Sequence, residues 1–172
     1  MILTELIQMK GAREVDKYAF QAEVTCIRPI GLTDRGLRLD ISLIGSVTEG
    51  SLTGCTVEII DYLLIRPGGV AVIDARDLIS DGDRVMAAVR AEGYIVPPFP
   101  MPELSVLADP NFQWPDVDLP MHGAHFWETA DENLSTAAAT VYGFTASANI
   151  ATGILKLSAR SLAAASQPVG VD

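Results

Sequence analysis

Three stretches of alternating residue types follow one another between Val57 and Tyr94, separated by two short turn signals. They read VEIIDYLLIR, VAVIDARDLI and RVMAAVRAEGY, with Pro-Gly-Gly after the first and Ser-Asp-Gly-Asp after the second. Alternation with a period of two is typical of a strand with one buried face, and short Gly-rich connections are typical of hairpins. The sequence therefore predicts a three-stranded antiparallel meander, which restricts the chain to sheet-based folds.

A tight turn at residues 67–69 would place Asp61 on the same face of the meander as Asp74 and Arg76. The rest of that face is predicted to be apolar: Ile59, Leu63, Ile65, Val70, Val72, Leu78, Val85, Ala87, Val89 and Ala91. The opposite face is predicted to hold Glu58, Arg66, Asp77, Arg84, Arg90 and Glu92. We therefore expect the first face to be the interior. Charged groups in such surroundings must pair with one another or act on a ligand.

Period-two alternation extends to other parts of the chain. It marks residues 18–28 and 37–47 before the meander, and residues 122–128, 137–147 and 152–160 after it. These eight strands, without a convincing long helix, predict an all-β fold: one closed, eight-stranded antiparallel β-barrel of calycin-like type. We expect one domain over residues 1–172, with the barrel at about 15–160 and a flexible tail at 163–172.

A Pro-rich stretch at residues 97–121 interrupts this pattern. Its seven prolines are Pro97, Pro98, Pro100, Pro102, Pro110, Pro115 and Pro120. We expect a long ordered loop with one short helix near residues 102–108. It would act as a lid over one barrel mouth, with Phe112 and Trp114 as apolar cover, or as an arm that packs on another subunit. Lys and Arg are absent from Ala91 to Leu155, so we do not expect a phosphate or coenzyme-A ester as ligand.

Composition narrows the possible partners and location. The 172 residues are 49% hydrophobic and carry a net charge of −10, which disfavours binding to nucleic acid or to anionic membranes. Cys26 and Cys55 lie in strand-like runs and are expected to be reduced core residues. The N-terminus lacks the features of a secretory signal, and no apolar run is long enough to span a membrane. These observations predict a cytoplasmic protein.

The meander also carries a recognisable motif. IDYLLIRPGGVAVIDARDLISDGD resembles the signature of the domain of unknown function 3237 family, through Tyr62, Arg66, Pro67, Gly69, Asp74, Ala75, Arg76, Asp81 and Gly82. The resemblance covers roughly residues 15–160 and implies an eight-stranded, commonly oligomeric β-barrel. Similar barrels in biosynthetic pathways are associated with cyclisation or isomerisation of hydrophobic intermediates without a cofactor. The Pro-rich stretch and HGAHFWET depart from the family pattern, so no site residue is carried over there.

Asp61, Asp74 and Arg76 are the first candidates for chemistry. An Arg–carboxylate pair across adjacent strands would fix the strand register inside the barrel. Two acids that share one arginine cannot both be fully compensated, so the pKa of one would rise and supply a general acid or base. Both interpretations remain open at the level of sequence.

His122 and His125 are the only histidines of the chain. Residues three apart in a strand point to opposite faces, so a shared metal site is disfavoured and none is predicted. A single histidine could act as acid or base, or be structural. His125 alternates in step with Trp127, which would place an imidazole and an aromatic wall in one cavity. Tyr142 and Tyr94 could polarise a carbonyl or merely bond to the backbone.

We therefore predict a cofactor-independent enzyme, a cyclase, isomerase or lyase, that acts on a hydrophobic, aromatic or polyketide-like molecule in the barrel lumen. Predicted catalytic residues are Asp74, Arg76, His125, Tyr142 and Asp61. Predicted ligand-binding residues are Trp127, Tyr94, His122, Trp114, Phe112, Leu63 and Val72. The alternatives are a non-catalytic barrel that binds a hydrophobic ligand and a scaffold subunit. An apolar outer face of the meander also predicts a homodimer or larger homo-oligomer.

Overall fold

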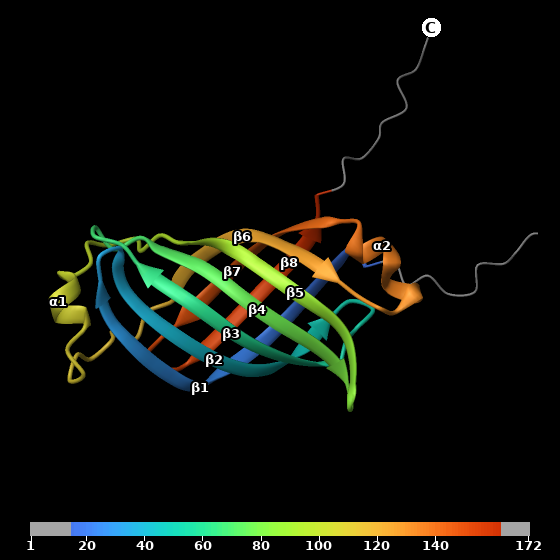
Figure 1. Ribbon diagram of the computed structural model, residues 1–172, viewed down its shortest axis with the longest axis horizontal. Coiled ribbons are helices and arrows are strands. Elements are labelled where there is room, and N and C mark those ends of the chain that lie inside the picture. The colour runs from blue at the N-terminus through green and yellow to red at the C-terminus, as the bar shows by residue number, and fades with distance from the viewer. Residues whose placement is uncertain (1–14, 163–172) are drawn as a thin grey trace, which may run out of the picture.

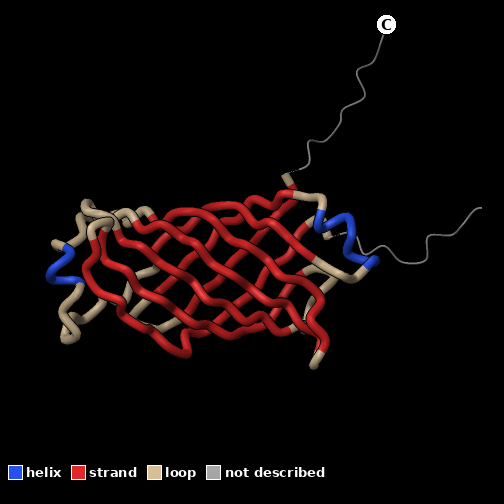
Figure 2. Tube along the Cα trace, in the orientation of Figure 1, coloured by secondary structure: helices blue, strands red, loops and turns tan. Residues whose placement is uncertain are grey.

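Eight antiparallel strands form a closed barrel in the computed structural model, which describes residues 15–162 (Figures 1 and 2). The strands are β1 (Lys17–Thr33), β2 (Gly36–Glu49), β3 (Thr56–Ile65), β4 (Ala71–Asp81), β5 (Arg84–Ile95), β6 (Leu119–Glu128), β7 (Val141–Asn149) and β8 (Ile154–Ser161). Each strand pairs with the next along the chain, and β8 returns to pair with β1. The predicted closed, eight-stranded barrel is confirmed. The flexible tail predicted at 163–172 and the start of the chain at 1–14 lie outside the described residues.

Short helices lie at the two ends of the barrel. In Figure 1, α1 (Leu104–Leu107) is at one end, and α2 (Ser135–Ala138), which directly follows the 3₁₀ helix η1 (Glu132–Leu134), is at the other. The helix predicted near residues 102–108 is thus present as α1. The strand predicted over residues 137–147 is wrong at its start, because 135–138 is helical and β7 begins at Val141.

The alternation of side chains along each strand builds the core. On β3 the buried residues are Val57, Ile59, Asp61, Leu63 and Ile65, every second position, as predicted. The intervening residues are exposed or half-buried, because successive side chains of a strand point to opposite faces. The prediction of the interior face of β3 is therefore confirmed.

On β4 the predicted face is wrong. Ile65 pairs with Ala71, so the connection from β3 to β4 contains five residues, not a tight turn. Within it the Arg66 N–H donates to the Val70 carbonyl oxygen at 2.9 Å, and Gly68 and Gly69 both have positive φ. One unexpected residue in a loop moves every following side chain to the other face. The buried residues of β4 are accordingly Ala71, Ile73, Ala75, Asp77 and Ile79.

Register shifts explain most of the other residues that the sequence placed on the wrong face of the sheet. Leu78, predicted inside, is exposed because of the same five-residue connection, whereas an irregularity between Ile79 and Ser80 leaves Val85 exposed, although it too was predicted inside. Beyond it, Ala87, Val89 and Ala91 of β5 are buried as predicted. Cys26, predicted in the core, is exposed because β1 has another register shift between Val24 and Cys26.

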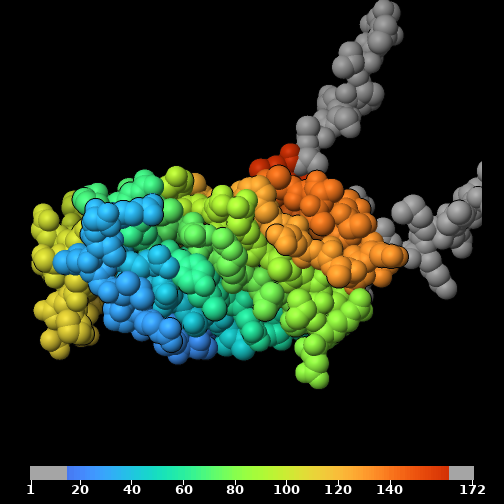
Figure 3. All heavy atoms as spheres, viewed as in Figure 1, coloured from blue at the N-terminus to red at the C-terminus, as the bar shows by residue number. Residues whose placement is uncertain are grey.

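The Pro-rich segment (residues 96–118) covers one end of the barrel. Leu107 is buried, and Phe99, Met101, Leu104, Ala108, Phe112, Trp114 and Val117 are half-buried against the core. The space-filling view shows α1 and its neighbours, in yellow, as a layer over that end (Figure 3). The Asn149 side-chain amide donates to Asp116 and Asp118, which ties the end of the segment to the end of β7.

Candidate functional site

The barrel interior is apolar except for a few buried polar side chains. Asp61 on β3, Asp77 on β4 and His125 on β6 are all less than 9% exposed. They line one small cavity of about 30 Å³ together with apolar side chains from β1, β2, β7 and β8. Three titratable groups from three strands therefore meet inside the barrel, and they are the candidate site.

His125 is held by a hydrogen-bonded row of aromatic residues. The Trp127 Nε1–H donates to the Tyr18 hydroxyl oxygen at 3.2 Å, and the Tyr18 hydroxyl is hydrogen-bonded to His125 Nδ1. An indole N–H can only donate, so the Tyr18 oxygen accepts from it. Among the described residues, Nδ1 is the one acceptor for the proton of the buried Tyr18 hydroxyl, so we assign that proton to the Tyr18–Nδ1 hydrogen bond. The proton of the neutral imidazole is then on Nε2. Burial lowers the pKa of His125 to about 3, which keeps the ring neutral.

Asp61 lies where the β3–β4 ladder is interrupted. Regular pairs occur at Asp61–Ala75 and again at Leu64–Val72. Between them the Asp74 backbone N–H donates to Asp61 Oδ1 at 3.2 Å. Burial raises the pKa of Asp61 to about 7, and this hydrogen bond opposes the shift because it favours the ionised form.

Asp77 is the second buried carboxyl group. Burial raises its pKa to about 8; the nearby Asp61 charge adds to the shift and the Arg76 charge opposes it. Two carboxyl groups whose pKa values lie near neutrality can hold a proton and release it at physiological pH.

Two atoms of this site have no hydrogen-bond partner among the described residues: Asp77 Oδ1 and His125 Nε2. A buried polar atom without a partner is destabilising, by about 1–3 kcal/mol, and is rare in folded proteins. Here a donor and an acceptor of this kind line the same cavity. The site is therefore arranged to receive a small group that can both accept and donate hydrogen bonds.

Of the other predicted members of the lumen site, Trp127, Leu63 and Tyr142 are inside the barrel, and Phe112 and Trp114 lie in the segment that covers its end. Trp127 and Leu63 are buried in the wall. Tyr142 is buried too, but its hydroxyl donates to the Val15 carbonyl oxygen at 2.7 Å, which favours the structural role. Phe112 and Trp114 contact each other edge to face in the Pro-rich segment, with ring centroids 5.3 Å apart.

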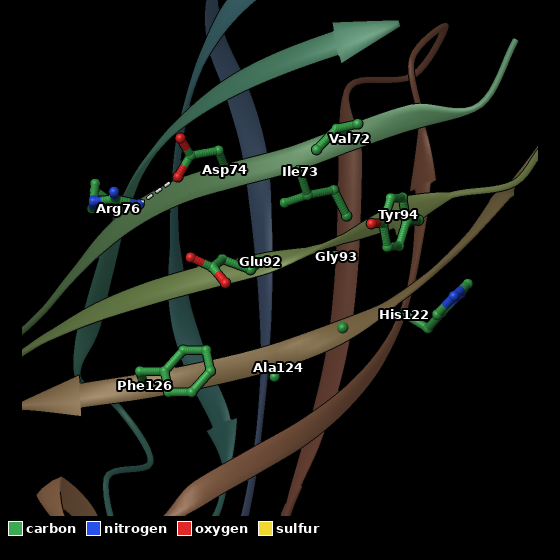
Figure 4. Close-up of a pocket in the computed structure, with 11 residues that line it drawn as sticks. Val72, Ile73, Asp74, Arg76, Glu92, Gly93, Tyr94, His122, Ala124 and Phe126 are labelled. Carbon is green, nitrogen blue, oxygen red and sulfur yellow. Dashed lines mark hydrogen bonds and ion pairs between the residues drawn. The ribbon is translucent and has the colours of Figure 1, made fainter. Parts of the chain in front are cut away.

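The remaining predicted site residues lie outside the barrel. Arg76 Nη1 donates to Asp74 Oδ1 at 2.7 Å, and both side chains are about half exposed, so the pair predicted inside is wrong in its location. The cause is the five-residue connection before β4. Figure 4 shows this pair in an open groove over β4, β5 and β6, together with Val72, Tyr94 and His122. His122 and His125 thus point to opposite sides of β6, as their spacing predicted.

The sequence interpretation missed Tyr18 as a site residue and assigned Asp77 to the outer face. Tyr18 belongs to an alternating run, but nothing in that run indicated that its hydroxyl would meet His125 on β6. Asp77 could have been found by allowing a five-residue connection between β3 and β4. Within residues 15–162, no group of three or more His, Cys, Asp or Glu side chains is placed to hold a metal ion.

Comparisons with known proteins identify the fold and nothing further. No family model matches the chain, and no curated protein matches its sequence. A protein of unknown function from Clostridium acetobutylicum has a solved structure similar to this one, with a TM-score of 0.62 and 21% identity over 83% of this chain and 94% of that one. A conserved protein of unknown function from Rhodopseudomonas palustris gives 0.61 and 18%, over 84% and 93% of the two chains.

A third solved structure, a beta-barrel like protein from Acinetobacter baumannii, has a TM-score of 0.60 and 20% identity, over 84% of this chain and 91% of that one. At such identities the likeness is one of barrel architecture. Among the described helices, none is long and apolar enough to cross a membrane.

Proposed function

We propose that the protein is a cofactor-independent enzyme that moves a proton within a neutral, hydrophobic small molecule in the barrel lumen, as an isomerase, cyclase or lyase. One observation carries the proposal: His125 Nε2 and Asp77 Oδ1, a donor and an acceptor that have no partner within residues 15–162, belong to side chains that line one cavity with Asp61. The raised pKa values of the two acids add support, because proton transfer is fastest when the pKa is near the working pH.

Each residue has a role in this chemistry. The Asp61 carboxylate removes a proton from the carbon next to a carbonyl group, and the C–H electron pair moves into an enolate. The His125 Nε2–H donates a hydrogen bond to the enolate oxygen, and the protonated Asp77 returns a proton to the same carbon, or to the γ-carbon where a C=C bond conjugates with the enolate. Asp61 is then protonated and Asp77 ionised, and a proton passes from Asp61 to Asp77 before the next turnover. Tyr18 and Trp127 hold the imidazole in the tautomer that donates from Nε2. The apolar wall excludes water and thereby strengthens these interactions.

The exchange of α-protons in deuterium oxide tests this role without knowledge of the natural substrate. The protein is incubated with small neutral ketones, and exchange is followed by NMR. We expect wild-type protein to accelerate exchange, and Asp61→Asn and Asp77→Asn to lower the rate about 100-fold or more. Asp74→Asn is the matched control on the outer surface and should retain the rate. Binding of the ketones without any acceleration by wild-type protein would contradict the enzyme proposal.

That result would support the alternative, a barrel that binds a hydrophobic ligand without turnover. The observation that favours it is the same pair of unpartnered atoms, which can hydrogen-bond a ligand as well as they can transfer a proton. In that case the Asn variants would change affinity and no reaction rate would respond.

We further propose that the protein works in the cytoplasm as a homo-oligomer and belongs with the domain of unknown function 3237 family. The family motif supports membership. Ile44, Ile60 and Leu78 are each more than 40% exposed and are the apolar members of a surface patch over β2, β3 and β4, which also contains Ser42, Glu58 and Arg76. The alternation placed Ala71, Ile73, Ala75 and Met86 on the apolar outer face of the meander together with Ile60, but these four residues are buried in the core. The patch is suited to a second copy of this chain.

A further inference from the structure

A second cavity adjoins the one that contains the candidate site. It measures about 60 Å³ and is lined by residues of β1, β2, β3 and β5 and of the β7–β8 turn. Leu43, Asp61 and Leu155 line both cavities, so these three side chains form the boundary between them. Asp61 therefore lies between the inner cavity, with His125 and Asp77, and the outer one.

The pairing of β1 with β8 closes the barrel, and we call it the closing seam. The outer cavity reaches the surface where this seam ends. Pairing of β1 with β8 stops at Glu23–Ile154, and the Val24 N–H then donates to the Gly153 carbonyl oxygen at 2.8 Å. Beyond this point β1 continues, paired with β2, to the barrel end that carries α1 (Figure 1). Ile27, which lines the cavity, is 41% exposed. None of the described residues lining the cavity belongs to the Pro-rich segment, although Asn149 of the lining donates hydrogen bonds to Asp116 and Asp118 at the end of that segment.

The outer cavity is lined mainly by apolar side chains, and the inner cavity by polar and apolar ones. Apart from Asp61 and Asn149, the side chains lining the outer cavity are aliphatic. The inner cavity offers the His125 Nε2–H and two carboxyl groups. Among the described residues, no Lys or Arg lines either cavity, so an anionic group would lack a partner. An uncharged oxygen-bearing head and an aliphatic tail are complementary to this arrangement.

The small volumes of the two cavities restrict how much of a ligand they can enclose. A cavity that holds benzene measures on the order of 150 Å³, well above either cavity here. The inner cavity has room for roughly one water molecule, and hence for a carbonyl or hydroxyl group. Because the outer cavity reaches the surface, an unbranched chain can extend through it and beyond, whereas a ring would have to fit inside. The cavities therefore favour a narrower ligand than the aromatic or polyketide-like molecule predicted from the sequence.

We propose that the lumen binds a slender, uncharged aliphatic ketone, aldehyde or alcohol, which enters between β1 and the β7–β8 turn, with its oxygen at His125 and its tail extending through the outer cavity towards the surface. The inference rests on the proposed lumen function. It adds the class of ligand and the route of access.

Three probes of similar length test the class of ligand: methyl butyl ketone, the hexanoate anion and phenyl methyl ketone. We expect methyl butyl ketone to bind about tenfold or more tightly than either of the others in calorimetry. It should also shift the His125 Nε2–H signal in protein labelled with nitrogen-15 histidine, where His122→Gln assigns the two rings. Equal or tighter binding of the aromatic ketone or the anion would overturn the proposed class.

Bulky substitutions at the opening test the route. Ile150→Trp in the β7–β8 turn and Ile27→Trp on β1 should each slow association of methyl butyl ketone about tenfold or more, because they narrow the passage. Val106→Trp on the exposed side of α1 is the matched control and should leave the association rate unchanged. Thermal unfolding of each variant establishes that the barrel is intact, and the second opening variant replaces the first if one fails to fold. Slowing by Val106→Trp alone would place the route through the Pro-rich segment instead.

These outcomes are distinct from those of the exchange experiment. If methyl butyl ketone binds and shifts His125 but its α-protons do not exchange, the catalytic proposal fails and the binding site stands. If exchange occurs only with the aromatic ketone, the catalytic proposal stands and the ligand class fails.

Discussion

The carboxyl group of Asp77 shows how strongly one buried side chain can link stability to pH. It is 4% exposed, and its Oδ1 has no partner among the described residues. An ordinary Asp ionises near pH 3.8, whereas the pKa values of Asp61 and Asp77 in the barrel are about 7 and about 8. From pH 4 to these values the folded protein binds more protons than the unfolded chain, so the free energy of unfolding falls as pH rises.

We predict that Asp77→Asn removes much of the fall in the free energy of unfolding between pH 4 and pH 8. The slope due to one such group is about 1.4 kcal/mol per pH unit, so the variant should be more stable than wild type at pH 8 and similar near pH 4. Urea unfolding at a series of pH values measures the difference. Asp81→Asn is the control, because Asp81 is exposed at the end of β4. A decline that is equally steep in Asp77→Asn and in wild type would show that the carboxyl does not stay protonated in the fold.

At acidic pH, His125 has the opposite effect on stability from the two buried carboxyl groups. Its pKa of about 3 means that the unfolded chain, with an ordinary value near 6.5, binds more protons below that pH. Stability due to His125 therefore falls as pH drops from about 6.5 towards 3, and it partly offsets the gain from the two acids in that range.

For single residues, the sequence predicted which side chains are buried better than it predicted which side chains they contact. The buried positions of Asp61, His125 and Trp127 followed from alternation within single strands. The outward position of Asp74 and the inward position of Asp77 did not, because they depend on the length of one connection. The bond between Tyr18 and His125 joins residues 107 positions apart, and no pattern within one strand carries that information.

Among the elements, β2 lies against the backbone of β1 at Gly45 with no room for a side chain. A Cβ atom added there would lie 1.9 Å from the Gln21 carbonyl oxygen and 2.5 Å from the Ala22 Cα. Both atoms belong to the backbone of β1, which cannot move without shifting its pairs on both sides. A glycine inside a strand often marks such a close approach.

We therefore predict that Gly45→Ala lowers the free energy of unfolding by about 1–3 kcal/mol, as overpacking does elsewhere. The neighbouring Ser46 is exposed, and Ser46→Ala should change stability by less than about 0.5 kcal/mol. Chemical unfolding of both variants compares them directly. A stable Gly45→Ala protein would mean that the two strands can separate at this position without loss.

Element boundaries were predicted well where a strand has a long alternating run and poorly where it has a proline or a short helix. β3 and β5 follow their sequence patterns closely, whereas β6 begins at Leu119 and includes Pro120. The Pro-rich segment was expected over one mouth of the barrel, and its apolar side chains do pack on that end. Whether it acts as a lid stays a prediction.

For the whole molecule, the apolar patch of Ile44, Ile60 and Leu78 bears on self-association. We predict that light scattering at micromolar concentration finds a dimer or larger oligomer, and that Ile60→Lys shifts it towards the monomer. Ile30→Lys on β1 is the matched control, since Ile30 is exposed outside the patch. A wild-type protein that is monomeric at this concentration would contradict the oligomer.

The closing seam between β1 and β8 has a consequence for how the barrel folds. Every other strand pair joins neighbours in sequence and can form as a local hairpin or meander, whereas the seam brings Lys17 to Arg160. The chain entropy of one very large loop must be lost at that single junction. Until it closes, the intermediate is a curved sheet with two unpaired edges, a form prone to associate with other chains. The same seam ends beside the proposed opening, so local fraying there would widen the route to the lumen while the other seven pairings hold.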